Sequence, residues 1–192
     1  MKKIFVFTAC LFVAFISFAQ QNSKFKPDLK PGLTFEYVIL SQGQEIPLIM
    51  KIATINDSGI VLDYDIQNGG ALGKFVNAKA NLEKGVSTNW DQPIAGEERT
   101  PDETQTIGMV SRPFLKSLKE QQKGKYDGMD FAVKTVPAGK EIMVGGKEMD
   151  VIYAESADGG SKMWILNNDL YPVLLKIEGT VPGIDMIIKD IR

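Results

Sequence analysis

Residues that commonly carry catalysis or bind metals are scarce in this chain of 192 residues. It contains no histidine, and its single cysteine, Cys10, lies in an apolar segment at the N-terminus. Without an imidazole or a second thiol, the chain cannot form a Ser-His-Asp triad or a zinc site of the usual nitrogen and sulfur ligands. We therefore predict no catalytic residue, no metal site and no cofactor, and a protein that is not an enzyme.

Carboxylates are the remaining candidates for chemistry. Asp63 and Asp65 open a segment that partly resembles a calcium-binding loop, but Gly69 stands one place too late and Lys74 replaces the final glutamate. We expect both aspartates on the solvent face of a strand. The run Gly69–Gly73 lacks a following helix and a lysine–serine pair, which indicates a bend or bulge and not a phosphate loop. A carboxylate-dependent hydrolase stays open as a third hypothesis, because it needs two carboxylates facing each other across a cleft.

Aromatic side chains offer another property, the binding of apolar ligands. Tyr37, Tyr64 and Trp164 lie on predicted strands, where the usual role of an aromatic residue is to fill the core. The alternative is a ligand-facing wall on the concave side of a curved sheet, and these three are our candidate ligand-binding residues. Trp90 stands alone in a polar loop and either forms the lip of a pocket or packs on the nearest apolar surface.

Residues 1–19 have the features of an export signal. Two lysines precede the apolar stretch Ile4–Phe18, which is shorter than the roughly 20 residues that span a bilayer. Ser17 and Ala19 are small residues at the positions that signal peptidase reads, so we predict cleavage between Ala19 and Gln20. The alternative is a lipoprotein cut before Cys10, which leaves a very short apolar region. We expect a soluble mature chain without a membrane span, in the periplasm or outside the cell.

The remaining composition is that of a globular protein. Hydrophobic residues make up 44% and charged residues 24% of the chain, which argues against disorder. Without the two N-terminal lysines the chain has 20 basic and 24 acidic residues, a net charge of −4 that gives no electrostatic reason to bind nucleic acid. We predict a polar tether over residues 20–31 and a single β-rich domain over residues 32–192.

Hydrophobic alternation with a period of two dominates the start of this domain. It predicts three consecutive antiparallel strands, Leu33–Leu40, Leu48–Thr54 and Ile60–Ile66, joined by short turns. Their inward side chains are expected to be Phe35, Tyr37, Met50, Ile52, Leu62 and Tyr64.

The second half repeats this pattern, and the middle differs. Six further strands are predicted at Phe131–Val136, Glu141–Val144, Glu148–Glu155, Ser161–Leu166, Tyr171–Glu178 and Ile184–Ile191. In the middle, Ala78–Lys84 predicts one or two helical turns, Val86–Glu103 a loop, and Thr106–Val110 a short strand. Ser111 is an expected N-cap of a helix that ends near Lys123. The predicted fold is mainly β, a large curved antiparallel sheet (an open half-barrel) with one short helix packed on it; the alternative is a closed β-barrel or a β-sandwich.

The C-terminal third carries a resemblance to known proteins. Its segments Val144–Lys147, Val151–Ala154 and Trp164–Lys176 resemble exported envelope proteins of Gram-negative bacteria that have the half-barrel fold of the outer-membrane lipoprotein carriers. The segment Gly32–Tyr37 resembles the mature start of a set of exported proteins of unknown function. The carriers are implied to hold acyl chains between a concave sheet and helices.

Besides the hydrolase hypothesis, the sequence leads to two functional hypotheses. The first is a non-enzymatic envelope protein that binds a lipid or other apolar or amphiphilic ligand in the concavity of the sheet. The alternative is a structural or interaction module with a filled core that works through its surface. A cavity of about 300 Å³ or more in the concave face would favour the first hypothesis.

Overall fold

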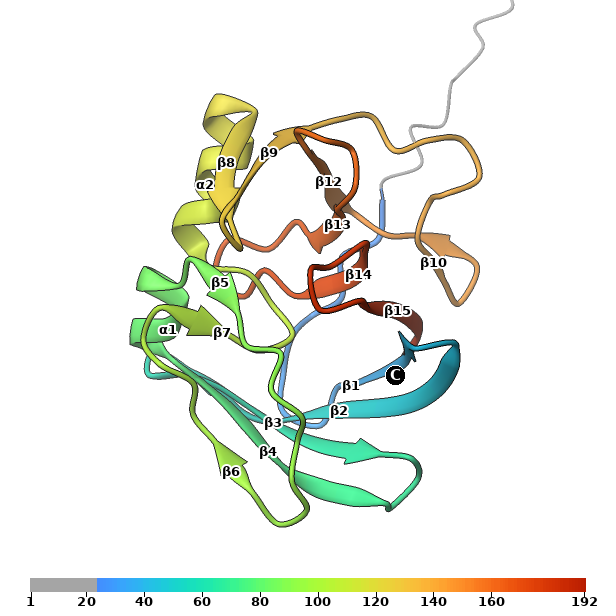
Figure 1. Ribbon diagram of the computed structural model, residues 1–192. Coiled ribbons are helices and arrows are strands. Elements are labelled where there is room, and N and C mark those ends of the chain that lie inside the picture. Colours follow the sequence, from blue (N-terminus) through green and yellow to red (C-terminus); the bar gives the residue numbers. More distant parts are fainter. Residues whose placement is uncertain (1–23) are drawn as a thin grey trace, which may run out of the picture.

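The computed structural model describes residues 24–192, so the predicted export signal and the cleavage site between Ala19 and Gln20 lie outside the described residues. Figure 1 shows a curled sheet with two helices at one end. The helices are α1 (Lys79–Lys84) and α2 (Arg112–Gln121). The strands are β1 (Thr34–Ser41), β2 (Gln44–Asn56), β3 (Gly59–Ile66), β4 (Ala71–Ala78), β5 (Ser87–Thr88), β6 (Glu98–Arg99), β7 (Gln105–Thr106), β8 (Lys123–Tyr126), β9 (Met129–Val133), β10 (Met143–Val144), β11 (Lys147–Glu148), β12 (Val151–Ser156), β13 (Lys162–Leu166), β14 (Leu174–Glu178) and β15 (Ile184–Ile191).

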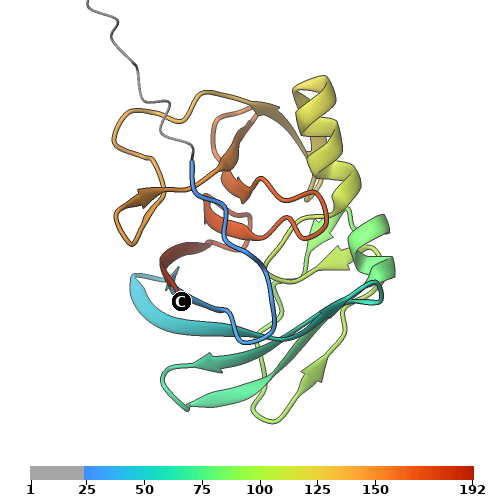
Figure 2. The same cartoon turned by 180° about the vertical axis from the view of Figure 1, so that it is seen from behind.

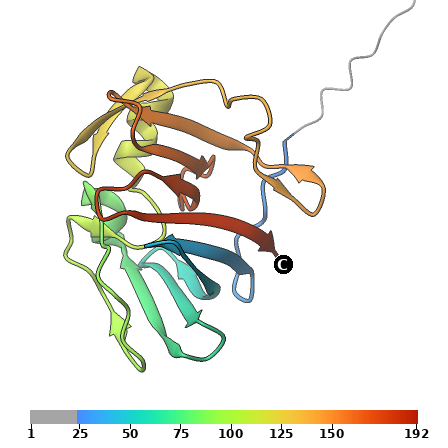
Figure 3. The ribbon, with the colours of Figure 1, turned by 45° about the vertical axis from the view of Figure 1, so that its right-hand side comes forward.

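Eleven of these strands form one sheet in the order β6-β4-β3-β2-β1-β15-β14-β13-β12-β9-β8. Its edge strands β6 and β8 do not pair with each other, so the sheet is open, and the predicted mainly β, curved and open sheet is confirmed. The sheet is mixed, because β6 runs parallel to β4 while the other neighbours are antiparallel. Figure 3 shows β15 in the middle of the curl, between the N-terminal and the C-terminal strands.

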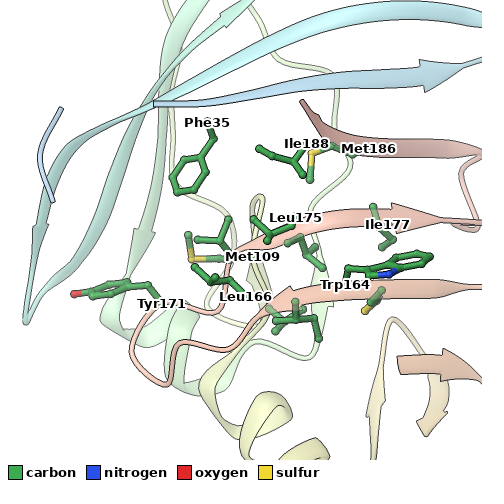
Figure 4. Packing of buried hydrophobic residues seen from close by; sticks show 14 of the residues in the cluster. Phe35, Met109, Trp164, Leu166, Tyr171, Leu175, Ile177, Met186 and Ile188 are labelled. Carbon is green, nitrogen blue, oxygen red and sulfur yellow. The ribbon is translucent and has the colours of Figure 1, made fainter. Parts of the chain in front are cut away.

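The first three strands are those that alternation predicts. β1 pairs with β2 and β2 with β3, both antiparallel, and all six side chains expected to face inward are buried. A shift of one residue would turn this whole set to solvent. Phe35 from β1 meets Met109 and Leu175 in the centre of the core, as Figure 4 shows.

Strand β4 is absent from the sequence-based prediction, which took Gly69–Gly73 as a bend and began a helix at Ala78. The bend exists as the turn before the strand, but the chain then pairs with β3 along its whole length. Alternation is hidden because two inward positions hold Gly73 and Asn77. A Cβ at Gly73 would lie 2.3 Å from the Tyr64 hydroxyl oxygen, so only glycine leaves room for that ring.

Residues 24–192 form two helices, where the prediction packed one on the sheet. Helix α2 begins as predicted, since the Ser111 side chain accepts a hydrogen bond from the Phe114 N–H at 3.4 Å. Its apolar face packs on the inner side of β8 and β9, where Phe114 stacks on Tyr126 at 4.7 Å between ring centroids. The predicted turns near residues 78–84 are the second helix, α1, which buries Leu82. Figure 2 shows both helices from behind, at the same end of the sheet.

The described part of the predicted tether, residues 24–31, lies against the domain. Phe25 forms a bridge with Met149, and its N–H donates to the Glu148 carbonyl oxygen at 2.7 Å. Phe25 and Leu29 both pack against the core.

Candidate functional site

A cavity of about 930 Å³ lies between the concave face of the sheet and the segment that connects α1 to α2. Its walls come from inward side chains of β1–β4 and from the facing strands β14 and β15. The innermost lining is apolar and includes Leu48, Met50, Phe75, Ile107, Leu174 and Met186. Apolar walls of this extent are typical of small-molecule sites, which fall within about 300–1,000 Å³.

The cavity opens at the end of the sheet that the helices leave uncovered. There the inward positions hold four isoleucines that are only half-buried, although they continue the alternation of core residues along their strands. They are Ile39 on β1, Ile46 on β2, Ile66 on β3 and Ile184 on β15. Figure 1 shows the turns β1–β2 and β3–β4 at the end of the sheet opposite to α1 and α2. The mouth therefore exposes apolar side chains to water.

One side of the cavity is closed by residues 88–99, which we call the strap. The strap starts at Thr88, whose N–H donates to the Asp127 carboxylate at 2.7 Å, and ends as strand β6 beside β4. Burial raises the pKa of Asp127 above its ordinary value. Near the other end, the Gly96 N–H donates to the Leu72 carbonyl and the Lys74 N–H donates to the Glu97 carbonyl.

Arg99 holds the shape of the strap from within. Its guanidinium donates to both carboxylate oxygens of Glu97, at 2.9 and 2.7 Å, and to the carbonyl oxygens of Asp91 and Gln92, at 2.6 and 2.9 Å. The hydrogen bonds from Arg99 hold the pKa of Glu97 below its ordinary value. The guanidinium of Arg99 is thus engaged in contacts within the strap and holds its conformation.

Trp90 lies on the strap and lines the cavity, which is the first of the two roles the sequence left open, and it packs on the core cluster, which is the second. The same residue also lines a second hollow of about 310 Å³, together with Met163 and Ile177. Its indole packs against the core cluster and is only partly buried. Trp90 therefore borders both hollows. Its isolated position in a polar loop was the one sequence signal that pointed to the strap.

The three aromatic residues proposed from the sequence do not line the cavity. Tyr37, Tyr64 and Trp164 are 2%, 2% and 1% exposed, and none belongs to the cavity wall. Tyr37 donates a hydrogen bond to the Leu174 carbonyl at 3.0 Å, and burial raises its pKa above the ordinary value. Its role on β1 is to tie this strand to the facing part of the core.

Tyr64 acts on the cavity indirectly, through the strap. Its ring stacks on Phe75 with centroids 4.2 Å apart and passes over Gly73. Its hydroxyl donates to the Ile94 carbonyl in the middle of the strap at 2.7 Å. Burial and the nearby Glu97 raise the pKa of Tyr64, although Arg99 opposes this. We regard Tyr64 as a positioning residue.

Trp164 points to the face of the sheet opposite to the second hollow. Its strand neighbour Met163 and the adjacent Ile177 line the second hollow, and successive strand residues face opposite sides. The Trp164 ring lies between Tyr153, at 4.6 Å between centroids, and the Lys176 ammonium, 4.4 Å from the ring centre. Trp164 is thus a buried residue of the core and not part of the cavity wall.

Side chains that could bind a metal ion are not clustered in residues 24–192. No group of three His, Cys, Asp or Glu side chains in this range is arranged to hold a metal ion. Asp63 and Asp65 lie on the outer side of β3, where Asp63 is opposite Lys51 and Lys74 in the ladders. Within the same range, neither helix has the length and the apolar character needed to cross a membrane.

In comparisons with known proteins, no family model, no curated protein and no solved structure matches this chain.

Proposed function

We propose that this protein binds an apolar or amphiphilic molecule in the cavity behind the strap and does not transform it. The observation that carries the proposal is the cavity of about 930 Å³ itself, with its apolar lining. A ligand chain placed there removes the half-buried isoleucines of the mouth from water, and burial of apolar surface is worth about 25 cal/mol per Å².

The proposal extends to the setting in which the protein works. We infer export through the predicted signal, with cleavage between Ala19 and Gln20, and a role in the periplasm or outside the cell. A lipid-binding function agrees with the resemblance to the outer-membrane lipoprotein carriers. N-terminal sequencing of the protein from the envelope fraction tests this part; an acylated Cys10, or an intact Met1 in the membrane, would contradict it.

Native mass spectrometry tests the binding itself. The protein is purified without detergent from the envelope fraction, and we expect a bound molecule that organic solvent extracts. In the variant Ala71→Phe, the new ring projects into the cavity from an inward position of β4, so the bound molecule should be lost. Ala157→Phe adds the same ring at an exposed turn and is the matched control.

The outcomes separate the proposal from its alternative. Loss of the molecule in Ala71→Phe and its retention in Ala157→Phe support the cavity as the site. If the wild-type protein carries nothing and takes up no added lipid, the alternative of a structural or interaction module gains the support.

A further inference from the structure

Only two charged side chains line the cavity, and one of them, Arg99, is already paired with Glu97. Among its lining residues, Asp91 and Arg99 are the charged ones. A guanidinium has five N–H donors, and four of those of Arg99 are used by Glu97 and the two strap carbonyls. The side chain is only 11% exposed. An incoming anion would therefore find no free cation in the wall.

The other ionic group makes an anion still less favourable. The Asp91 carboxylate accepts a hydrogen bond from the Asn89 amide at 2.9 Å and forms no ion pair within residues 24–192. It leaves a net negative charge at the mouth, but Asp91 is exposed to water, so a cationic head group would gain little by pairing with it. A carboxylate or phosphate brought close to it would be repelled, and burying an unpaired anion costs far more than burying a neutral polar group.

Uncharged hydrogen-bonding groups, in contrast, surround the mouth. Four glutamine side chains come from three separate segments, and none makes a side-chain hydrogen bond within the described chain. They are Gln42 and Gln44 at the β1–β2 turn, Gln67 at the β3–β4 turn, and Gln92 on the strap. Each amide offers donors and an acceptor.

Asn89 adds a buried acceptor to this set. Its amide nitrogen donates to Asp91 and, at 3.2 Å, to Gln105, which fixes the orientation of the group. Its Oδ1 atom is buried and has no hydrogen-bond partner in residues 24–192. A buried acceptor without a partner costs about 1–3 kcal/mol, and a hydrogen-bond donor brought in by a ligand removes that cost.

We infer that the ligand is an amphiphile with an uncharged, hydroxyl- or amide-bearing head group and an alkyl chain. The chain lies on the apolar lining, and the head lies among the amides of the mouth. Hydroxyl and amide groups donate as well as accept, so they match both the glutamine amides and Asn89. This inference rests on the proposed function and adds the chemical class of the ligand.

Calorimetric titration with three probes of the same alkyl chain tests it. The probes are dodecyl maltoside, dodecanoate and dodecyltrimethylammonium, each kept below its critical micelle concentration and added to the delipidated full-length mature protein. We expect the maltoside to bind at least about tenfold more tightly than dodecanoate, a difference of about 1.4 kcal/mol. Tighter binding of dodecanoate or of the ammonium compound would overturn the inference and leave the proposed function standing. Binding of none of the three would overturn the proposed function itself.

A charge placed at the mouth provides the matched pair of variants. Gln67→Lys introduces a free cation among the cavity-lining amides and should raise the affinity for dodecanoate severalfold. Gln121→Lys places the same charge on the exposed end of α2, outside the cavity lining, and should leave all three affinities unchanged. If Gln67→Lys leaves the affinity for dodecanoate at its wild-type value, the head group does not lie among these amides and the inference is wrong.

Discussion

Replacing Tyr64 with phenylalanine tests how the strap is held over the cavity. The hydroxyl of Tyr64 donates to the Ile94 carbonyl at 2.7 Å and ties the middle of the strap to the inner face of β3. The ring itself is held by its stacking on Phe75. Tyr64→Phe therefore removes one hydrogen bond and keeps the packing of the ring.

The expected magnitude follows from that single bond. A neutral hydrogen bond contributes about 1 kcal/mol, so the open form of the strap should become roughly fivefold more populated. Hydrogen exchange measures such local opening. The amides of Gly96 and Lys74 bridge the strap and β4, and they should exchange about fivefold faster in the variant.

Tyr37→Phe is the matched control for this experiment. Tyr37 is equally buried, faces inward from β1, and also donates its hydroxyl to a backbone carbonyl, that of Leu174. Both variants should lower the global free energy of unfolding by about 1 kcal/mol. Only Tyr64→Phe should speed exchange at Gly96 and Lys74. Unchanged exchange of these two amides in Tyr64→Phe, or an equal rise in Tyr37→Phe, would refute the reasoning.

Three further predictions concern stability and pH. Gly73→Ala should cost about 1–3 kcal/mol, seen as a lower melting temperature, because its Cβ would collide with Tyr64; Gly160→Ala, whose Cβ meets nothing nearer than 3.4 Å, should have little effect. Trp164→Ala should cost about 3–5 kcal/mol in urea unfolding and leave ligand affinity unchanged, whereas Trp90→Ala should weaken binding; the opposite pattern would place Trp164 in the site. The pKa of Glu97 is lowered by Arg99, so the support that its carboxylate gives the strap is present at neutral pH and is lost as the pH falls through that lowered value. Strap exchange, corrected for its intrinsic pH dependence, should therefore rise once the pH falls below the ordinary pKa of a glutamate side chain in the wild type but not in Glu97→Gln.

Much of the sheet could be predicted because burial and strand period coincide there. In β1–β3 most inward positions carry a large apolar side chain, and the turns contain glycine, asparagine or aspartate. Strand β4 was missed because two of its inward residues, Gly73 and Asn77, are required by contacts with other parts of the chain and are not apolar core residues. Gly73 makes room for Tyr64, and Asn77 bonds both the N–H and the carbonyl of Ile107, at 2.8 and 2.9 Å. Contacts with partners about 10 to 30 residues away do not produce a hydrophobic alternation in the sequence of the strand.

The candidate binding residues differ from the residues that line the cavity for a related reason. Aromatic size and a strand position do not distinguish a wall from a core, and Tyr37, Tyr64 and Trp164 all proved to be fully covered. The half-buried residues Ile39 and Ile46 look the same in the sequence as the core residues that precede or follow them. The exposure of these isoleucines depends on which other elements cover that end of the sheet, and the sequence of the strand alone does not show this.

The lengths of the elements explain why a cavity remains. Strand β2 has thirteen residues, so it extends about 43 Å when straight, at 3.3 Å per residue. Helix α2 has ten residues and α1 six, so end to end they extend only about 24 Å, at 1.5 Å per residue. The helices cover one end of the concave face, and the strap crosses part of what is left. The far ends of β1, β2 and β3 continue to place isoleucines on the inner face, with no element of the described chain long enough to cover them. The fold thus leaves an apolar surface exposed, and a ligand that covers this surface would explain why it is there. For this reason the affinity measurements, more than any stability measurement, decide what this protein does.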